Sequence, residues 1–239
     1  MNWFKKIFGK RKEVPPAPTK PRKVYFIPGF GADEKIFYNL TLDNVLPVYV
    51  NWLDPLHHET YQSYAERMSA SIEDEEPIIV GVSFGGMLTL EIARTRPVRQ
   101  VILISSIKSS KELPFKWKLA GKLRLNKIVP LKRIQEYERF YASANKKLGA
   151  FTPEEQNFAN SYRRTIKKGY LLWALDQIIN WNNEQYPTNV IHIHGDEDKI
   201  FPIKSTHPTH IIKGGTHMSI VNRADEISRI LNDELSKIH

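Results

Sequence analysis

Short apolar runs alternate with stretches of helical periodicity along most of the chain. Apolar runs of four to seven residues, typical of parallel strands buried on both faces, are found at 24–27, 48–52, 77–83, 101–105, 189–194 and 209–213. Amphipathic helical spacing is found between them at 60–74 and 84–96, and a last helix carries the apolar stripe Ile220, Ala224, Ile227 and Leu231. This alternation predicts an α/β domain on a doubly wound, mostly parallel sheet.

One interval, residues 107–187, interrupts the alternation for about eighty residues without a convincing strand. Within it, Thr152-Pro153-Glu154-Glu155 has the pattern of a capping box with proline at the first helical position, and Phe151 could act as a hydrophobic staple. Residues 169–181 are strongly apolar and are expected to pack back on the sheet. The pattern therefore predicts a helical lid at about 107–168, inserted into the α/β domain.

The sequence Gly81-Val82-Ser83-Phe84-Gly85 fits the pattern G-x-S-x-G and lies between a predicted strand and a predicted helix. In that context the sharp strand-to-helix turn exposes a serine hydroxyl above the sheet, and glycines two positions away avoid collisions with the neighbouring elements. Ser83 is therefore the candidate nucleophile.

A serine nucleophile needs an imidazole base that is oriented by a carboxylate. Two later strands end in suitable residues: Asp196, Glu197 and Asp198 follow the strand at 189–194, and His217 follows the strand at 209–213. The three elements occur in the chain order serine, acid, histidine. His217 is the candidate base.

With these motifs, the chain from about Lys23 onward resembles small bacterial α/β-hydrolases of the serine esterase and lipase type. The H-G-x-x-D pattern of that family, ahead of a proline, matches His194, Gly195, Asp198 and Pro202. The resemblance implies Asp198 as the acid of the triad, with Asp196 as the alternative. It also implies that Pro28-Gly29-Phe30-Gly31 is similar to the family's oxyanion segment H-G-x-G, with proline where histidine is common.

By this resemblance, the backbone N–H groups of Phe30 and Phe84 would stabilise the oxyanion. Asp33 and Glu34 follow the same loop near the expected pocket, and helix capping is the preferred interpretation of both. The position of the insertion and its aromatic residues suggest that it covers the pocket and sets acyl specificity, with Phe115, Trp117 and Trp173 as candidate lining residues. The rival interpretation is a docking surface.

The absence of cysteine excludes disulfides, thiolate metal sites and a cysteine nucleophile. Two further patterns are incomplete. Gly29-Phe30-Gly31 begins like a dinucleotide fingerprint but has Glu34 at the third glycine position. His192, His194 and Asp196 match part of a binuclear metal motif, but Glu197 replaces its next histidine. No metal or organic cofactor is implied.

The net charge of +9 is unevenly distributed, because residues 1–23 carry +7, residues 107–187 carry +9 and the remainder is acidic. No nucleic-acid motif accompanies this charge. Residues 1–22 form a basic, proline-rich tail ahead of the domain at 23–239. The first twelve residues are either a short amphipathic helix at an anionic membrane or a solubilising tail. The tail has neither a spanning segment nor a secretory signal, so a cytoplasmic location is expected, with possible peripheral contact at the inner face of the membrane.

These features together predict a serine hydrolase that cleaves a carboxylic ester or thioester through an acyl-enzyme. Two alternatives stay open. The same triad supports acyl transfer to an alcohol or amine, and the fold also serves non-catalytic ligand-binding or membrane-associated proteins. The intact set of Ser83, Asp198 and His217 favours an enzyme.

Overall fold

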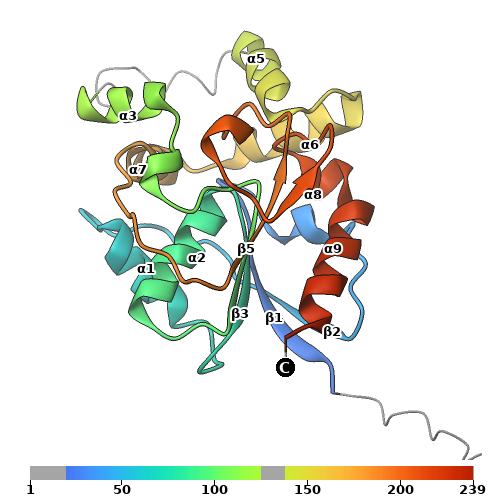
Figure 1. Cartoon of the computed structure of the whole chain (residues 1–239). Coiled ribbons are helices and arrows are strands. Elements are labelled where there is room, and N and C mark those ends of the chain that lie inside the picture. Colours follow the sequence, from blue (N-terminus) through green and yellow to red (C-terminus); the bar gives the residue numbers. More distant parts are fainter. Residues whose placement is uncertain (1–19, 125–137, 239) are drawn as a thin grey trace, which may run out of the picture.

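A computed structural model describes residues 20–124 and 138–238 of the chain (Figure 1). These residues contain a six-stranded sheet with strand order β2-β1-β3-β4-β5-β6, in which every neighbouring pair is parallel. The strands are β1 (Arg22–Ile27), β2 (Val45–Tyr49), β3 (Ile78–Val82), β4 (Gln100–Ile104), β5 (Val190–Gly195) and β6 (His210–Ile212). The prediction of a parallel α/β sheet is confirmed.

Helices cover both faces of this sheet, as Figure 1 shows for α1 and α2 on one side and α9 on the other. The α-helices of the described residues, with the first 3-10 helix, are η1 (Glu34–Phe37), α1 (Tyr61–Ser69), α2 (Phe84–Thr95), α3 (Phe115–Lys122), α5 (Glu138–Leu148), α6 (Pro153–Thr165), α7 (Lys168–Ile179), α8 (Ser219–Asn222) and α9 (Ala224–Ser236). The doubly wound arrangement follows from this two-sided cover.

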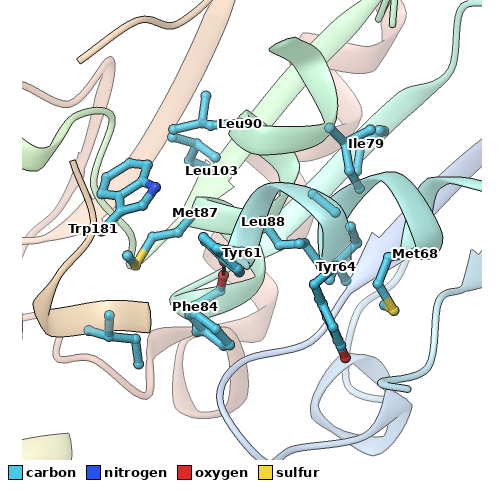
Figure 2. Close-up of a cluster of buried hydrophobic side chains, with 14 of the residues drawn as sticks. Tyr61, Tyr64, Met68, Ile79, Phe84, Met87, Leu88, Leu90, Leu103 and Trp181 are labelled. Atoms are coloured by element: carbon cyan, nitrogen blue, oxygen red, sulfur yellow. Dashed lines mark hydrogen bonds between the residues drawn. The ribbon is translucent and has the colours of Figure 1, made fainter. Parts of the chain in front are cut away.

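Two hydrophobic cores lie on opposite faces of the sheet because successive strand residues point to opposite sides. Tyr25 and Ile79 pack with α1, α2 and α7, in the cluster that Figure 2 shows in part. The alternate residues Phe26 and Val80 pack with η1 and α9 instead. The continuous apolar runs of the central strands are thus used on both sides.

Strand β2 is the largest departure from the predicted strands. It covers Val45–Tyr49 and not 48–52, and it contains Pro47, which lies opposite Val24 of β1. Because β2 is an edge strand, the missing N–H of Pro47 leaves no partner strand unsatisfied. Trp52 consequently lies beyond the strand, in the connection to α1.

Two helices also differ from the sequence-based expectation. Helix α1 ends at Ser69, so Ile72 is buried from the following turn rather than from the helix. The last predicted helix is divided at Arg223, whose φ of −127° and ψ of 30° are not helical. Its apolar stripe stays on the core side across the break, since Ile220 and Ile227 are both buried in the same cluster.

The insertion between β4 and β5 is helical in the part that the structure describes, with α3, α5, α6 and α7. The predicted capping box is present: the Thr152 hydroxyl accepts a hydrogen bond from the Glu155 backbone, and the Glu155 carboxylate accepts one from the Thr152 backbone. The predicted staple is wrong, because Phe151 is exposed and the residue one turn into the helix is Gln156. Helix α7 packs back on the sheet through Ala174 and Ile178.

The predicted amphipathic helix at residues 1–12 lies outside the described residues, as does most of the proline-rich linker. Across the described residues, every helix is too short or too polar to cross a bilayer.

Candidate active site

Ser83 lies at a strained turn between β3 and α2. Its φ of 53° and ψ of −117° are unusual for a residue with a side chain, and they direct the hydroxyl away from the sheet. The flanking glycines allow this turn, because a Cβ at Gly81 would lie 2.6 Å from the Gly85 carbonyl oxygen and a Cβ at Gly85 would overlap the carbonyl of Ile27. The G-x-S-x-G pattern therefore reflects close packing on both sides of the serine.

The structure brings the three sequence-predicted triad residues into one hydrogen-bonded chain. His217 follows β6, and its Nε2 lies 2.8 Å from the Ser83 hydroxyl oxygen. Its Nδ1 lies 2.8 Å from Oδ2 of Asp198, which follows β5. With its proton on Nδ1, His217 donates to Asp198 and accepts from Ser83. All three residues come from the carboxyl ends of parallel strands.

Asp198 is buried and held by several donors. Its Oδ1 accepts backbone hydrogen bonds from Ile200 at 2.7 Å and Phe201 at 2.9 Å. Burial favours the neutral acid, yet the charge and hydrogen bond of His217, together with these backbone donors, lower the pKa of Asp198 below its ordinary value. The carboxylate that faces His217 is thus kept ionised.

Asp196, the alternative acid, points elsewhere. It is exposed, and its Oδ1 accepts a hydrogen bond from the backbone N–H of Gly214 at 2.6 Å. That contact joins the two loops that carry Asp198 and His217, but it does not involve the imidazole. The geometry therefore selects Asp198 over Asp196.

The loop after β1 lies beside Ser83, with Gly29 close enough that a Cβ there would be 3.6 Å from the Ser83 Cβ. Phe84 is the first residue of α2, so its backbone N–H has no acceptor within the helix. Phe30 belongs to the adjacent loop, and its ring meets that of Phe84 edge-on at 6.4 Å. The two residues predicted to donate to an oxyanion are therefore neighbours next to Ser83.

Two aromatic residues that the sequence analysis did not single out hold these donors in place. The indole N–H of Trp52 donates to the Gly29 carbonyl at 3.1 Å, and its ring stacks on Phe84 at 5.3 Å. Tyr61 stacks on the same ring at 5.2 Å and donates to the Phe84 carbonyl at 3.2 Å, the hydrogen bond drawn in Figure 2. The only sequence signal for Trp52 was its position at the end of the apolar run 48–52.

An apolar cavity of about 380 Å³ opens over Ser83 and His217. Its floor is formed by the loop after β1 and the elbow, and its cover comes from the insertion. Lining residues contributed by the insertion include Trp117, Leu148, Phe158, Ile166, Leu171 and Leu175. Such a cavity fits an apolar chain attached to a group at Ser83.

Of the three candidate lining residues, only Trp117 borders this cavity, where its ring meets that of Phe201 at 5.6 Å. The expectation for Phe115 is wrong, because its side chain is 75% exposed on the outer side of α3. The expectation for Trp173 is also wrong. Its ring packs on Tyr64 in the core, and its N–H donates to the Glu59 carbonyl at 2.9 Å.

The cover is joined to the loop after β1 by a polar contact. Asp33 caps η1 as expected, accepting from the Lys35 backbone at 3.0 Å, and the same oxygen accepts a 2.6 Å hydrogen bond from the Tyr162 hydroxyl of α6. Burial opposes ionisation of Asp33, but its bonds to Lys35 and Tyr162 lower its pKa overall. The hydrogen bond from Tyr162 to Asp33 thus connects the insertion to the loop that borders the candidate oxyanion site.

His192 and His194 of β5 are both buried and make hydrogen bonds inside the protein. His194 donates from Nε2 to the Phe201 carbonyl at 2.7 Å, and its Nδ1 accepts from Nε2 of His192 at 3.1 Å. Within the described residues, no group of three or more histidine, acidic or cysteine side chains could hold a metal ion. The bond to Phe201 instead supports the turn that carries Asp198.

Acid should destabilise the protein through this pair. Burial lowers the pKa of His192 from 6.5 to about 3. The contribution of the neutral, buried imidazole to the stability of the fold is therefore complete above pH 6.5 and is lost as the pH falls towards 3. Between pH 6.5 and 4.5, protonation of the unfolded chain at this residue alone should lower the free energy of unfolding by about 2 kcal/mol. Urea unfolding at the two pH values measures the loss.

The variant His192→Gln should lose about 2 kcal/mol less than the wild type over that interval. His207→Gln, at an exposed position, is the matched control and should keep the wild-type pH dependence. Equal acid sensitivity in wild type and His192→Gln would contradict the assignment.

Comparison with known proteins agrees with this fold. The sequence matches the Alpha/beta hydrolase family over residues 24–230, nearly the whole chain. The protein therefore belongs to the alpha/beta hydrolase family. Among curated proteins the sequence has no match.

Solved structures share the fold at low sequence identity. A thermophilic esterase from Thermogutta terrifontis is 12% identical, with a TM-score of 0.67 over 91% of this chain and 90% of its own. MenH from S. aureus is 16% identical, with a TM-score of 0.67 over 91% and 94%. An epoxide hydrolase from Bacillus megaterium is 12% identical, with a TM-score of 0.64 over 90% and 94%. These likenesses concern the fold, and the chemistry must be argued from the site.

Proposed function

We propose that this protein is a serine hydrolase that cleaves carboxylic esters or thioesters through an acyl-enzyme. The observation that carries the proposal is the hydrogen-bonded chain from Ser83 through His217 to Asp198 at the floor of an apolar cavity. In the proposed mechanism, the Ser83 oxygen attacks the acyl carbonyl while His217 takes its proton. His217 then returns the proton to the leaving group, and a water that it activates releases the acid.

The charge that develops on the carbonyl oxygen would be met by the backbone N–H groups of Phe30 and Phe84. Donors that are fixed in advance stabilise a transition state without reorganisation, and one such donor is worth about 3 kcal/mol. The rings of Trp52 and Tyr61, packed against Phe84, support this rigidity. In this scheme the hydroxyl oxygen of Ser83 is the attacking atom.

A fluorophosphonate probe tests the nucleophile directly. The full-length protein should become labelled at one site, and peptide mass analysis should place the label on Ser83. An absence of labelling in folded protein would reject the serine hydrolase proposal. Labelling with turnover only in the presence of an added alcohol or amine would instead indicate acyl transfer.

The cavity favours esters with a medium apolar acyl chain. Each methylene moved from water into the cavity contributes about 0.8 kcal/mol, so kcat/KM should rise about fourfold per methylene until the cavity is full. A series of 4-nitrophenyl esters from acetate to decanoate measures this dependence. A flat series would contradict an acyl role for the cavity.

Two residues on the same helix form a matched pair for this series. Trp117→Ala enlarges the cavity and should move the best acyl chain to greater length, whereas Phe115→Ala removes an exposed ring and should leave the series unchanged. A shift caused by Phe115→Ala, or none caused by Trp117→Ala, would show that the acyl chain binds elsewhere.

A further inference from the structure

Helix α3 presents an exposed apolar face to solvent. Phe115, Leu119 and Leu123 are 75%, 42% and 54% exposed, and their four-residue spacing places them in one stripe along the helix. Exposed large apolar residues grouped on one side of a helix are unusual in a soluble protein, and they mark contact surfaces. We refer to these three side chains as the α3 stripe.

The opposite face of α3 packs against the rest of the protein. Trp117 borders the cavity, and Gly121 lies against the end of α7 so closely that a Cβ would overlap the Ile179 carbonyl oxygen. The orientation of the helix is therefore fixed from the inside, and this fixed orientation turns the α3 stripe outward. Figure 1 shows α3 at the periphery of the molecule, beyond α7.

Lysines border the α3 stripe on both sides. At 100° per residue, Lys116 lies next to one edge of the stripe, and Lys118 and Lys122 lie next to the other. All three are exposed. This arrangement, large apolar side chains between cations, is that of a helix lying in the interface of an anionic bilayer, where the lysine stems extend towards the headgroups.

We propose that the α3 stripe and its flanking lysines dock the protein on an anionic lipid bilayer. An anionic bilayer is the partner that fits the charge of the insertion, because the sequence of residues 107–187 carries a net charge of +9 and basic residues are attracted to anionic lipid. Docking in this orientation would place the lipid surface against the side of α3 that faces away from the cavity. The proposal concerns binding and stands independently of the catalytic one.

Co-sedimentation of the full-length protein with vesicles tests the proposal. The protein should bind vesicles of phosphatidylglycerol and phosphatidylcholine in equal parts much more strongly than vesicles of phosphatidylcholine alone, and added salt should weaken that binding. The double variant Phe115→Ser/Leu119→Ser should lower the partition coefficient at least tenfold. The variant Lys116→Gln/Lys122→Gln should lower binding to the anionic vesicles to a similar extent and reduce its salt dependence.

Phe151→Ser is the matched control, because Phe151 is an exposed aromatic residue of the same insertion whose backbone N–H donates to the Glu155 carboxylate at 2.7 Å. It should bind as the wild type does. Thermal unfolding of each variant should match that of the wild type, since the replaced side chains are exposed.

Wild-type protein that binds neither type of vesicle would overturn the proposal. So would equal anionic-vesicle binding by wild type and Phe115→Ser/Leu119→Ser, which would show that another part of the chain accounts for binding. Light scattering across a range of protein concentrations covers a further outcome, in which the same double variant abolishes a dimer and the stripe joins two copies of the chain. The expected result is a monomer whose vesicle binding is lost specifically with the α3 stripe.

Discussion

Replacing Ser83 with alanine is expected to lower ester turnover by up to about 10⁶-fold while leaving the fold intact. The substitution removes the oxygen of the proposed nucleophile, which lies 2.8 Å from Nε2 of His217, and it removes no packed methylene. Turnover of a 4-nitrophenyl ester, with thermal unfolding measured in parallel, provides the test. Full esterase activity in Ser83→Ala would reject the proposed mechanism.

The partner substitution shows whether the residues act as one unit. His217→Ala should cost about as much as Ser83→Ala, and the double variant should cost little more, because each single change already disables proton transfer at the nucleophile. Additive losses in the double variant would mean that the two side chains act independently. That outcome would contradict the proposal that proton transfer takes place across the 2.8 Å contact between Ser83 and His217.

Replacing Asp198 with asparagine is expected to lower turnover by about 10⁴-fold. The asparagine oxygen would keep the backbone bonds from Ile200 and Phe201, and its amide group would then point at Nδ1 of His217. An amide donor there favours the tautomer with the proton on Nε2, which cannot accept a proton from Ser83. The imidazole would stay in place as the wrong tautomer.

Asp196→Asn is the matched control for this prediction. The oxygen of asparagine can still accept from the Gly214 backbone, and the exposed position faces no imidazole. Its turnover should stay within about threefold of the wild type, which is the scale of a small surface change. A severe loss in Asp196→Asn with normal turnover in Asp198→Asn would reverse the assignment of the acid.

Local pattern was sufficient to predict most of the fold. Continuous apolar runs identified the buried strands because a parallel strand covered on both faces needs apolar residues at every position. The same reasoning placed β2 three residues too late, since Pro47 argues against a strand unless the strand lies at an edge. Whether a strand lies at the edge depends on the order of all the strands in the sheet, and the residues of one short segment do not encode that order.

The candidate site divides in the same way. The sequence was sufficient to identify the candidate residues. The elbow around Ser83 follows from a strand, a tight turn and a helix, and the order of the candidate acid and base follows from the strand ends. The choice between Asp196 and Asp198 rested on a motif, and the structure supplied the distances that separate them. Only tertiary structure could show that Trp52 holds the loop at Gly29, because that contact joins two connections after different strands.

The sequence by itself determined that the chain forms a parallel α/β domain with a helical insertion, and that a serine, an acid and a histidine follow its strands in order. Tertiary structure decided which side of each inserted helix faces the cavity. Phe115 and Trp117 lie two residues apart and look equivalent in sequence, yet one is exposed and the other borders the cavity. The physical reason is that helical periodicity defines faces, whereas packing of Gly121 against the end of α7 sets the rotation of α3 about its axis.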